Sequence, residues 1–345
     1  MKGKLNLIGV GGAGINSTVE TYEYIKELGN MFSDVSINLL DTSIKTIKNY
    51  RKYSEDFKLI TTNKVSVEDY DGMGSERKNK DVNSDFKSSV EEYVDLMKFN
   101  KSRSDFYVIT ISTTGATGST IGLMLADIML NLGYNLIVVM IGSTSSLIRI
   151  NNDIDTTVKL NSIAVRNNKA LSVIYFNNTI DGNVNSKNEK IVNSRIRRIL
   201  SVFSLYISGS VHNLDLQDII NFITPTNYST FNINPGIYEL VVGQGNISDD
   251  NILLALSIIK DESSSFDINT SLLVDKTGYL QEIEEIFDTD CIHLLFRRNQ
   301  IQKNLIHAKD ALKSMSADLF NGDKYITAGN TDIFDELSTD EDDGF

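Results

Sequence analysis

Cysteine and histidine are scarce in this sequence, and their scarcity excludes several kinds of site. The chain has a single cysteine, Cys291, so it cannot form an internal disulfide, and it has only three histidines. One thiol and three imidazoles do not easily assemble a zinc site. Cys291 lies in the apolar run CIHLLF, which predicts a small buried hydrophobe. Such sparing use of cysteine is typical of a protein from a reducing cytoplasm.

Long apolar runs and an excess of basic charge are also missing. No apolar stretch approaches the ~18 residues that a membrane-spanning helix needs, and the opening MKGKLNLIGV is too short for the core of a secretory signal. The formal net charge is −13. Nucleic acids and anionic membranes both attract basic surfaces, so neither is an expected direct partner. These observations together favour a cytoplasmic protein.

What is present begins with an alternation of apolar strands and helices. Strands that are apolar at nearly every position are buried on both faces, which predicts a parallel sheet between helices and ligands at the carboxyl ends of the strands. We expect strands at 4–10, 36–40, 57–61, 105–112, 135–141 and 171–176. We expect helices at 13–28, 88–97, 122–132 and 152–164, the last with Asp in its first turn, and a loop over 75–85.

The second half of the chain starts with a long helix, expected over residues 191–208, whose apolar positions recur at three- and four-residue steps. It is followed by expected strands at 237–242, 271–275 and 291–297 and expected helices at 251–260, 279–287 and 299–320. The domains predicted from this order are 1–190, a central helix at 191–212, a smaller α+β unit at 213–325 and an acidic tail at 326–345. The tail is expected to be disordered or to bind a partner.

The first candidate site is the glycine loop GVGGAGIN, residues 9–16. Gly9, Gly11 and Gly14 satisfy G-x-G-x-x-G between a strand and a helix. Glycines let the backbone approach a phosphate closely, and the helix N-terminus supplies N–H donors. That chemistry serves dinucleotides and mononucleotides alike, and a tight turn without a ligand has the same pattern. A Walker A loop is excluded, because no G-K-[ST] follows.

A second loop, STTGATGST at residues 112–120, also follows a strong strand and opens an apolar helix. A third glycine segment contains Gly72, Gly74 and Ser75. A dinucleotide enzyme needs one such loop, whereas several could surround a triphosphate with backbone dipoles. The alternative is a set of Gly/Thr turns with capping hydroxyls.

The third stretch, Asn213-Leu-Asp215-Leu-Gln-Asp218, follows the long helix. Carboxylates three residues apart project from the same side of one helical turn. Helix capping explains the same residues, because Asp is common at the N-cap and in the first turn.

In their order and spacing, GVGGAGIN, TGATGST and N-x-D-x-x-D resemble the phosphate loop, signature loop and synergy loop of the tubulin/FtsZ family of GTPases. The resemblance extends to about residue 320. The stretch NNDIDTTVKLNSIAV and the acidic tail are most similar to the phage-encoded tubulins of that family. Thr114, Ala116 and Thr120 stand where the signature loop usually has glycine, which leaves its backbone path and the rate of GTP turnover open. Ala13 is a milder departure.

The resemblance implies a Rossmann-type, tubulin/FtsZ-like α/β fold that binds GTP or GDP with Mg²⁺. In the first loop the phosphates and the sugar side would be contacted by Gly11, Gly12, Ala13, Gly14 and Asn16. Asp41 and Thr42 would form the second contact loop, and the γ-phosphate would face Gly72, Gly74 and Ser75. The α- and β-phosphates would be held by Gly115, Ala116, Thr117, Gly118 and Ser119. Guanine would be read by Asn178 and Asn193, since an amide both donates and accepts.

The resemblance also implies that Asp215 and Asp218, with Asn213, act on the GTP of a neighbouring subunit. The carboxylates would orient and deprotonate the attacking water, while Mg²⁺ offsets the phosphate charge. A head-to-tail contact does not close on itself, so it builds a filament, which hydrolysis then weakens. The expected function is a dynamic filament in phage-infected bacteria that positions phage DNA or capsids. The acidic tail would bind a basic patch on a neighbour, or would only keep the protein soluble; the candidate patch residues are Arg195, Arg197, Arg198, Arg297 and Arg298.

Two other functions compete with this interpretation. A Rossmann oxidoreductase would use Gly9 to Gly14 with Asp41 on a ribose, but it leaves residues 112–120 and 213–218 without a role. A filament protein that does not hydrolyse GTP would result if the altered signature loop had lost activity.

Overall fold

The computed structural model of the chain describes residues 2–43, 48–59, 83–99, 104–179, 186–225, 233–261, 263, 266–269 and 274–322. Gly72, Gly74, Ser75 and the acidic tail therefore lie outside the described residues. Within the described part, no helix has the length and apolar character that crossing a bilayer requires.

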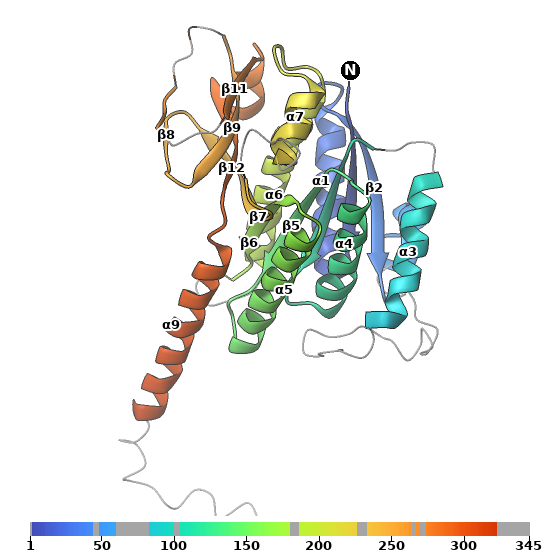
Figure 1. The fold of residues 1–345 in the computed structure, drawn as a ribbon, viewed down its shortest axis with the longest axis vertical. Coiled ribbons are helices and arrows are strands. Elements are labelled where there is room, and N and C mark those ends of the chain that lie inside the picture. The colour runs from blue at the N-terminus through green and yellow to red at the C-terminus, as the bar shows by residue number, and fades with distance from the viewer. Residues whose placement is uncertain are drawn as a thin grey trace, which may run out of the picture.

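A ten-stranded sheet runs through the molecule in the order β11-β9-β12-β7-β6-β5-β4-β1-β2-β3 (Figure 1). The strands from β3 to β7 are parallel, as their apolar sequences predict. In β5 every residue is buried. These strands are β1 (Lys4–Val10), β2 (Asp34–Asp41), β3 (Phe57–Leu59), β4 (Phe106–Ser112), β5 (Leu136–Gly142), β6 (Ala170–Asn177) and β7 (Gly236–Gln244).

Helices cover both faces of the parallel strands, and alternate residues of β1 reach the two cores. Leu5 and Leu7 join the core beneath α1 and α6, whereas Ile8 and Val10 join the core beneath α3, α4 and α5. The helices are α1 (Gly11–Leu28), α3 (Asn83–Phe99), α4 (Leu123–Asn131), α5 (Leu147–Arg166) and α6 (Ser186–Ile207). A 3₁₀ helix spans Arg51–Asp56, and a π-helical turn, Gly118–Gly122, precedes α4.

The C-terminal strands extend the same sheet from β7. β12 (Cys291–Arg298) is antiparallel to β7 and to β9 (Ile252–Ile259), and β11 (Val274–Tyr279) is parallel to β9. A separate pair consists of β8 (Ile247–Ser248) and β10 (Ile268–Asn269). The helices here are α7 (Leu216–Ile223), α8 (Ile283–Phe287) and α9 (Ile301–Gly322). One sheet therefore runs through both halves of the chain and marks no border between them. The predicted domain boundaries stay predictions.

The helix predicted over 251–260 is wrong, because Ile252–Ile259 is strand β9. All eight of its residues are buried, and a short apolar run buried on both faces has no periodicity that separates a strand from a helix. The predicted helix over 279–287 is also mostly wrong: Tyr279 ends β11, and only Ile283–Phe287 is helical.

Three helices, α3, α5 and α6, start five residues earlier in the chain than predicted. The structure begins α3 at Asn83, inside the predicted loop, and begins α6 at Ser186. It begins α5 at Leu147, after Ser146, whose hydroxyl accepts a hydrogen bond from the backbone N–H of Arg149. The aspartates expected in the first turn of that helix therefore lie further along it, and Asp153 is fully buried.

The central helix α6 joins two opposite ends of the molecule. Near its start, Asn193 donates a hydrogen bond to Glu20 of α1. At its end, the carbonyl of Ile207 accepts a hydrogen bond from the N–H of Gly3, just before β1. A helix of 22 residues is about 33 Å long. The start of β1 and α7 therefore lie at one end of the molecule, and the turn from β1 into α1 lies at the other (Figure 1).

Candidate functional site

Three of the predicted loops meet where β1, β2 and β4 end. Gly11 has a left-handed backbone (φ +71°), and a Cβ there would lie 3.3 Å from the Cβ of Thr117 and 3.4 Å from the N of Gly118. The hydroxyl oxygens of Thr42 and Thr117 are 2.9 Å apart. The first loop, the turn after β2 and the signature loop are thus in direct contact, as expected for neighbouring parallel strands.

Within the described residues, the N-terminus of α1 has no side-chain cap. Its N-cap is Val10, which provides no side-chain cap, and its first turn carries no acidic residue. A Cβ on Gly12 would meet nothing within 4 Å. An uncapped helix N-terminus that opens onto free space fits an anion, because the N–H groups and the helix dipole both favour negative charge.

Gly14 has a different role from its neighbours in the first loop. A Cβ there would overlap the carbonyl oxygen of Thr110 on β4. Gly14 therefore lets α1 pack closely against the sheet, while Gly12 faces the open space and Ala13 is half-buried. The phosphate contact of Gly14 stays a prediction, because the direction of a Cβ does not decide where its backbone N–H points.

The signature loop turns back on Ser112. The Ser112 hydroxyl accepts a hydrogen bond from Gly115 N–H at 3.2 Å, and a Cβ on Gly118 would lie 2.6 Å from the Ser112 carbonyl oxygen. Ala116 and Thr117 are each only 8% exposed, and Ala116 packs in the core beneath α3, α4 and α5. Gly115 and Ser119 remain half-buried, as do Thr114 and Thr120, so these loop residues keep surface that a ligand could contact.

Asp41 and Thr42 are both buried at the end of β2. The Asp41 carboxylate accepts a hydrogen bond of 2.7 Å from the N–H of Thr42. The carboxylate therefore shapes its own turn. A ribose contact of the kind that the oxidoreductase alternative requires would need a more accessible carboxylate.

Two side chains of α1 and two of α6 form a polar cluster between these helices. Asn16 donates to Glu189 at 3.2 Å, and the buried Asn193 donates to Glu20 at 3.1 Å. The hydroxyl of Tyr50 donates a hydrogen bond to the amide oxygen of Asn16. Sequence reasoning named the two amides but missed both glutamates. Their spacing was a usable signal, since Asn16/Glu20 and Glu189/Asn193 are each four residues apart on a helix.

The two amides that follow β6 differ in their hydrogen bonding. The side chain of Asn177 donates to the Thr144 hydroxyl and accepts from the N–H groups of Thr144 and Thr179. The buried side-chain oxygen of Asn178 has no hydrogen-bond partner among the described residues. Asn177 thus holds two loops together, and Asn178 keeps an acceptor for another group.

Asp153 is a buried carboxyl group just behind these loops. Burial raises its pKa to about 6. Hydrogen bonds from the hydroxyls of Tyr175 and Thr113 and from the N–H of Ser143 act in the opposite direction and lower the pKa. The Tyr175 hydroxyl donates to it at 2.7 Å. Gly142 leaves room for this carboxylate, because a Cβ at position 142 would overlap it.

The raised pKa of Asp153 predicts a pH-dependent stability. Below about pH 3.8 the group is protonated in both the folded and the unfolded chain, so it has no effect. As the pH rises from 3.8 to 6, the unfolded chain is ionised before the folded one, and the folded state loses roughly 3 kcal/mol relative to it. Urea unfolding at pH 5 and pH 7.5 should show about half of this loss in wild type, roughly 1.4 kcal/mol, because the rest is already lost at pH 5. Asp153→Asn should reduce the difference, and an unchanged difference would contradict the assignment.

The predicted synergy loop, residues 213–218, caps α7. Asp215 is the N-cap and accepts a hydrogen bond of 2.9 Å from the N–H of Asp218, whose carboxylate accepts one of 3.2 Å from the N–H of Asp215. Asn213 has a left-handed backbone (φ +65°). Lys276 of β11 forms an ion pair with Asp218. The capping interpretation is therefore realised in the structure, at the opposite end of α6 from the glycine loops.

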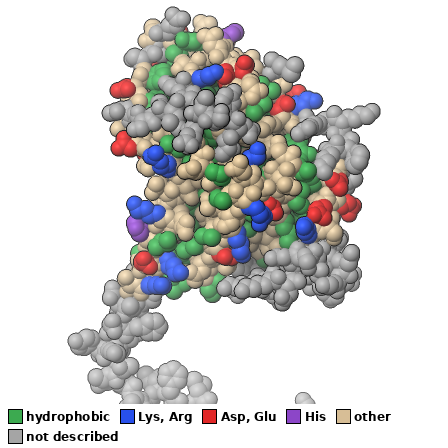
Figure 2. Space-filling view, viewed as in Figure 1, with side chains coloured by type: hydrophobic (Ala, Val, Ile, Leu, Met, Phe, Trp, Pro, Cys, Tyr) green, Lys and Arg blue, Asp and Glu red, His purple; other side chains and the backbone are tan. Residues whose placement is uncertain are grey.

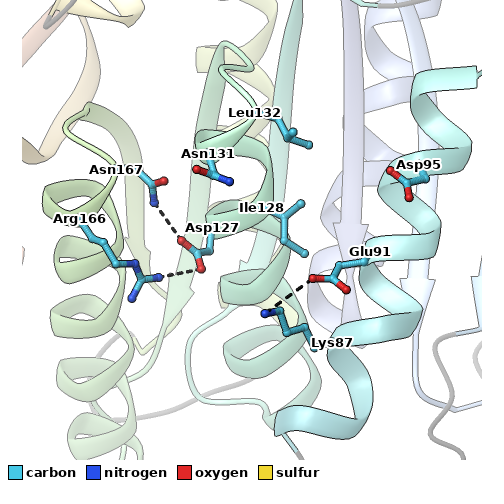
Figure 3. A pocket seen from close by; sticks show the side chains of 9 residues that line it. All are labelled: Lys87, Glu91, Asp95, Asp127, Ile128, Asn131, Leu132, Arg166 and Asn167. Atoms are coloured by element: carbon cyan, nitrogen blue, oxygen red, sulfur yellow. Dashed lines mark hydrogen bonds and ion pairs between the residues drawn. The ribbon is translucent and has the colours of Figure 1, made fainter.

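A cleft of about 550 Å³ lies between α3, α4 and α5 and contains none of the predicted site residues (Figure 3). Asp127 is paired there with Arg166 and Asn167, and Lys87 with Glu91. Figure 2 shows acidic and basic side chains intermixed over one face of the described residues. Within the predicted basic patch, Arg297 is already paired with Glu239 and Asp249, so its charge is largely compensated.

Comparison with known proteins shows that the fold is similar to that of phage tubulins. No protein-family model matches the sequence. A phage tubulin-like protein of Pseudomonas phage 201phi2-1 is 23% identical over 195 residues, which cover 56% of this chain and 60% of that relative's length. The structure of phage tubulin PhuZ with GDP superimposes with a TM-score of 0.70 at 18% identity, covering 98% of this chain and 96% of PhuZ. The TubZ protofilament of bacteriophage PhiKZ gives a TM-score of 0.68 at 20% identity, covering 98% and 95%.

These matches show that the chain has the tubulin/FtsZ fold, which confirms the predicted fold class. Within that fold, the predicted similarity to the phage tubulin PhuZ is also confirmed.

Proposed function

We propose that this chain binds GTP, polymerises head to tail and hydrolyses GTP at the contact between subunits. One observation carries the proposal: the glycine loops and the synergy loop lie at opposite ends of α6, a helix about 33 Å long. Asp215 and Asp218 therefore cannot reach a nucleotide that is bound at the glycine loops of the same chain. A second copy, stacked in the same orientation, would bring them together.

The geometry of the loops supports a nucleotide at the carboxyl ends of β1, β2 and β4. The uncapped start of α1, with open space at Gly12, would accept the phosphates. Gly115 and Ser119 of the signature loop would lie beside the phosphates. Mg²⁺ would bind to the phosphate oxygens of the nucleotide and offset their negative charge. For the γ-phosphate we retain the predicted contacts at Gly72, Gly74 and Ser75.

Guanine would lie beside the amides next to α1 and β6. The unpartnered oxygen of Asn178 would accept a hydrogen bond from the base. Asn193 already donates to Glu20, so its remaining amide oxygen would be the group offered to guanine. Glu189, four residues before Asn193, is a further carboxylate acceptor near this edge.

In the assembled filament, Asp215 and Asp218 would orient and deprotonate the water that attacks the γ-phosphate of the neighbour. Asn213 would set the turn that presents them. Because the contact is heterologous, it adds subunits without closing. Among structures with the same fold, one is a phage tubulin with GDP and another is a protofilament, which supports guanine-nucleotide binding and self-association for this chain.

The biological setting follows from the same similarities. We propose a phage-encoded filament in the cytoplasm of an infected bacterium, with phage DNA or capsids as its cargo. The acidic tail would contact a neighbouring subunit, with Arg195, Arg197 and Arg198 of α6 and Arg298 of β12 as the remaining candidate partners.

A single assay tests the proposal. Purified protein is centrifuged with GTP, GDP or a slowly hydrolysed GTP analogue, and phosphate release is measured in the same tubes. We expect pelleted filaments with GTP and with the analogue, and phosphate release only above the concentration at which filaments form. Phosphate release proportional to protein concentration at every dilution would contradict the proposal, as would the absence of filaments. Filaments without phosphate release would support the non-hydrolysing alternative.

A further inference from the structure

Lys276 is the one residue outside the synergy loop that the structure joins to its carboxylates by an ion pair, among the described residues. It comes from β11, 58 positions further along the chain than Asp218. The Lys276 side chain is 50% exposed and that of Asp218 is 13% exposed. The ammonium group therefore lies at the surface, on the solvent side of the carboxylate.

The two oxygens of Asp218 have different donors. Oδ2 accepts a hydrogen bond from the N–H of Asp215, which closes the capping box, and Oδ1 accepts one from the ammonium group of Lys276. A carboxylate held by two donors from different elements has little freedom to rotate. The pair fixes the direction in which Asp218 faces the surface that a neighbour would approach.

The loop itself is held in place without Lys276. The backbones of His212 and Tyr279 exchange two hydrogen bonds of 2.9 Å, which tie the start of the loop to β11. Gly278 of β11 lies so close to Val211 and Leu214 that a Cβ would overlap their side chains. Removing the Lys276 ammonium should therefore leave the position of the loop unchanged.

The positive charge of Lys276 lies at a surface that would approach a negatively charged nucleotide. Asp215 and Asp218 would face the polyanionic nucleotide of a neighbour, on a chain whose formal net charge is −13. Like charges brought together oppose association, and a cation placed between them offsets the repulsion. Lys276 is located where it compensates one carboxylate at that surface.

We propose that Lys276 is a positioning residue of the subunit contact: it orients Asp218 and supplies the positive charge that lets an acidic loop dock on a nucleoside triphosphate. This inference rests on the proposed function. It predicts that Lys276 affects both the assembly of subunits and the turnover within the polymer, without contributing to nucleotide binding by the isolated subunit.

The test compares Lys276→Met, which keeps the length of the side chain and removes its charge, with Lys276→Arg. Lys260→Met is the matched control, because Lys260 is also paired with an acid, Glu284, which is not part of the synergy loop. At low salt we expect Lys276→Met to raise the critical concentration for GTP-dependent filaments by about fivefold and to lower phosphate release per polymerised subunit. Lys276→Arg should restore both, Lys260→Met should match wild type, and salt should reduce the difference in critical concentration.

Thermal unfolding and nucleotide binding of Lys276→Met should match wild type, which separates positioning from folding. A second variant pair adds a test of coupling: in an Asp218→Asn background, Lys276→Met should change phosphate release much less than it does in wild type. Equal critical concentrations and turnover in wild type and Lys276→Met would overturn the inference, and so would a defect that Lys276→Arg shares. If wild type itself forms no filaments with GTP, the proposed function fails before the variants are compared.

Discussion

Asp218→Asn is expected to assemble into filaments with GTP and to release phosphate at least about 100-fold more slowly per polymerised subunit than wild type. The carboxylate would be lost as a base and as an acceptor for the attacking water. The amide keeps an oxygen that can accept the N–H of Asp215, so the cap of α7 is retained. Filaments should therefore persist, because the step that weakens them has been slowed. Pelleting and phosphate release in one sample measure both effects.

The matched control for this variant is Asp155→Asn. Asp155 is an exposed acid of α5 that is paired with Lys159, so the change removes the same charge elsewhere on the surface. Its turnover should equal that of wild type. Normal turnover in Asp218→Asn would show that the catalytic carboxylate has been assigned to the wrong residue.

Gly12→Val is expected to weaken GTP binding about 100-fold while leaving the stability of the nucleotide-free protein nearly unchanged. A Cβ at this position would meet no described atom within 4 Å, so we expect the fold to tolerate the side chain. The same side chain would fill the space in front of the first turn of α1, where phosphate oxygens must come within about 3 Å of N–H groups. Losing two hydrogen bonds to a charged group costs roughly 3 kcal/mol. Equilibrium binding of a fluorescent GTP analogue and thermal unfolding provide the two measurements.

Gly133→Ala should give the opposite result. Gly133 has a left-handed backbone (φ +75°) after α4, and a Cβ there also meets no neighbouring atom. A residue with a side chain is strained in that conformation by about 1 kcal/mol, so the melting temperature should fall while GTP affinity stays the same. If Gly12→Val and Gly133→Ala both keep full affinity, the phosphates bind elsewhere.

Much of the parallel sheet can be read from the sequence, because its strands are apolar on both faces and end in glycine or polar turns. The predicted strand at 4–10 agrees with β1 residue for residue. The error at 251–260 has a physical cause. NILLALSIIK has residues that suit a buried helix or a buried strand equally, and only its pairing with β11 and β12 decides between them.

The candidate site is partly readable for a related reason. Motif order predicts that the loops after β1, β2 and β4 are neighbours, since parallel strands end at one edge. The sequence does not show that Gly14 serves packing or that Asn193 is already bonded to Glu20, because both depend on how α1 lies against β4 and α6. Lys276 also escaped notice, because its partner is 58 residues away in the chain.

The measurement that tests the central claim most directly is complementation between the two variants described above. Gly12→Val keeps an intact synergy loop but has a defective nucleotide pocket, and Asp218→Asn has an intact pocket but a defective loop. Each alone should release little phosphate. Mixed at concentrations that allow filaments, they should release phosphate well above the sum of the two, because loops of one variant dock on pockets of the other. A mixture no more active than its components, although both are folded and co-pellet, would contradict an active site shared between subunits.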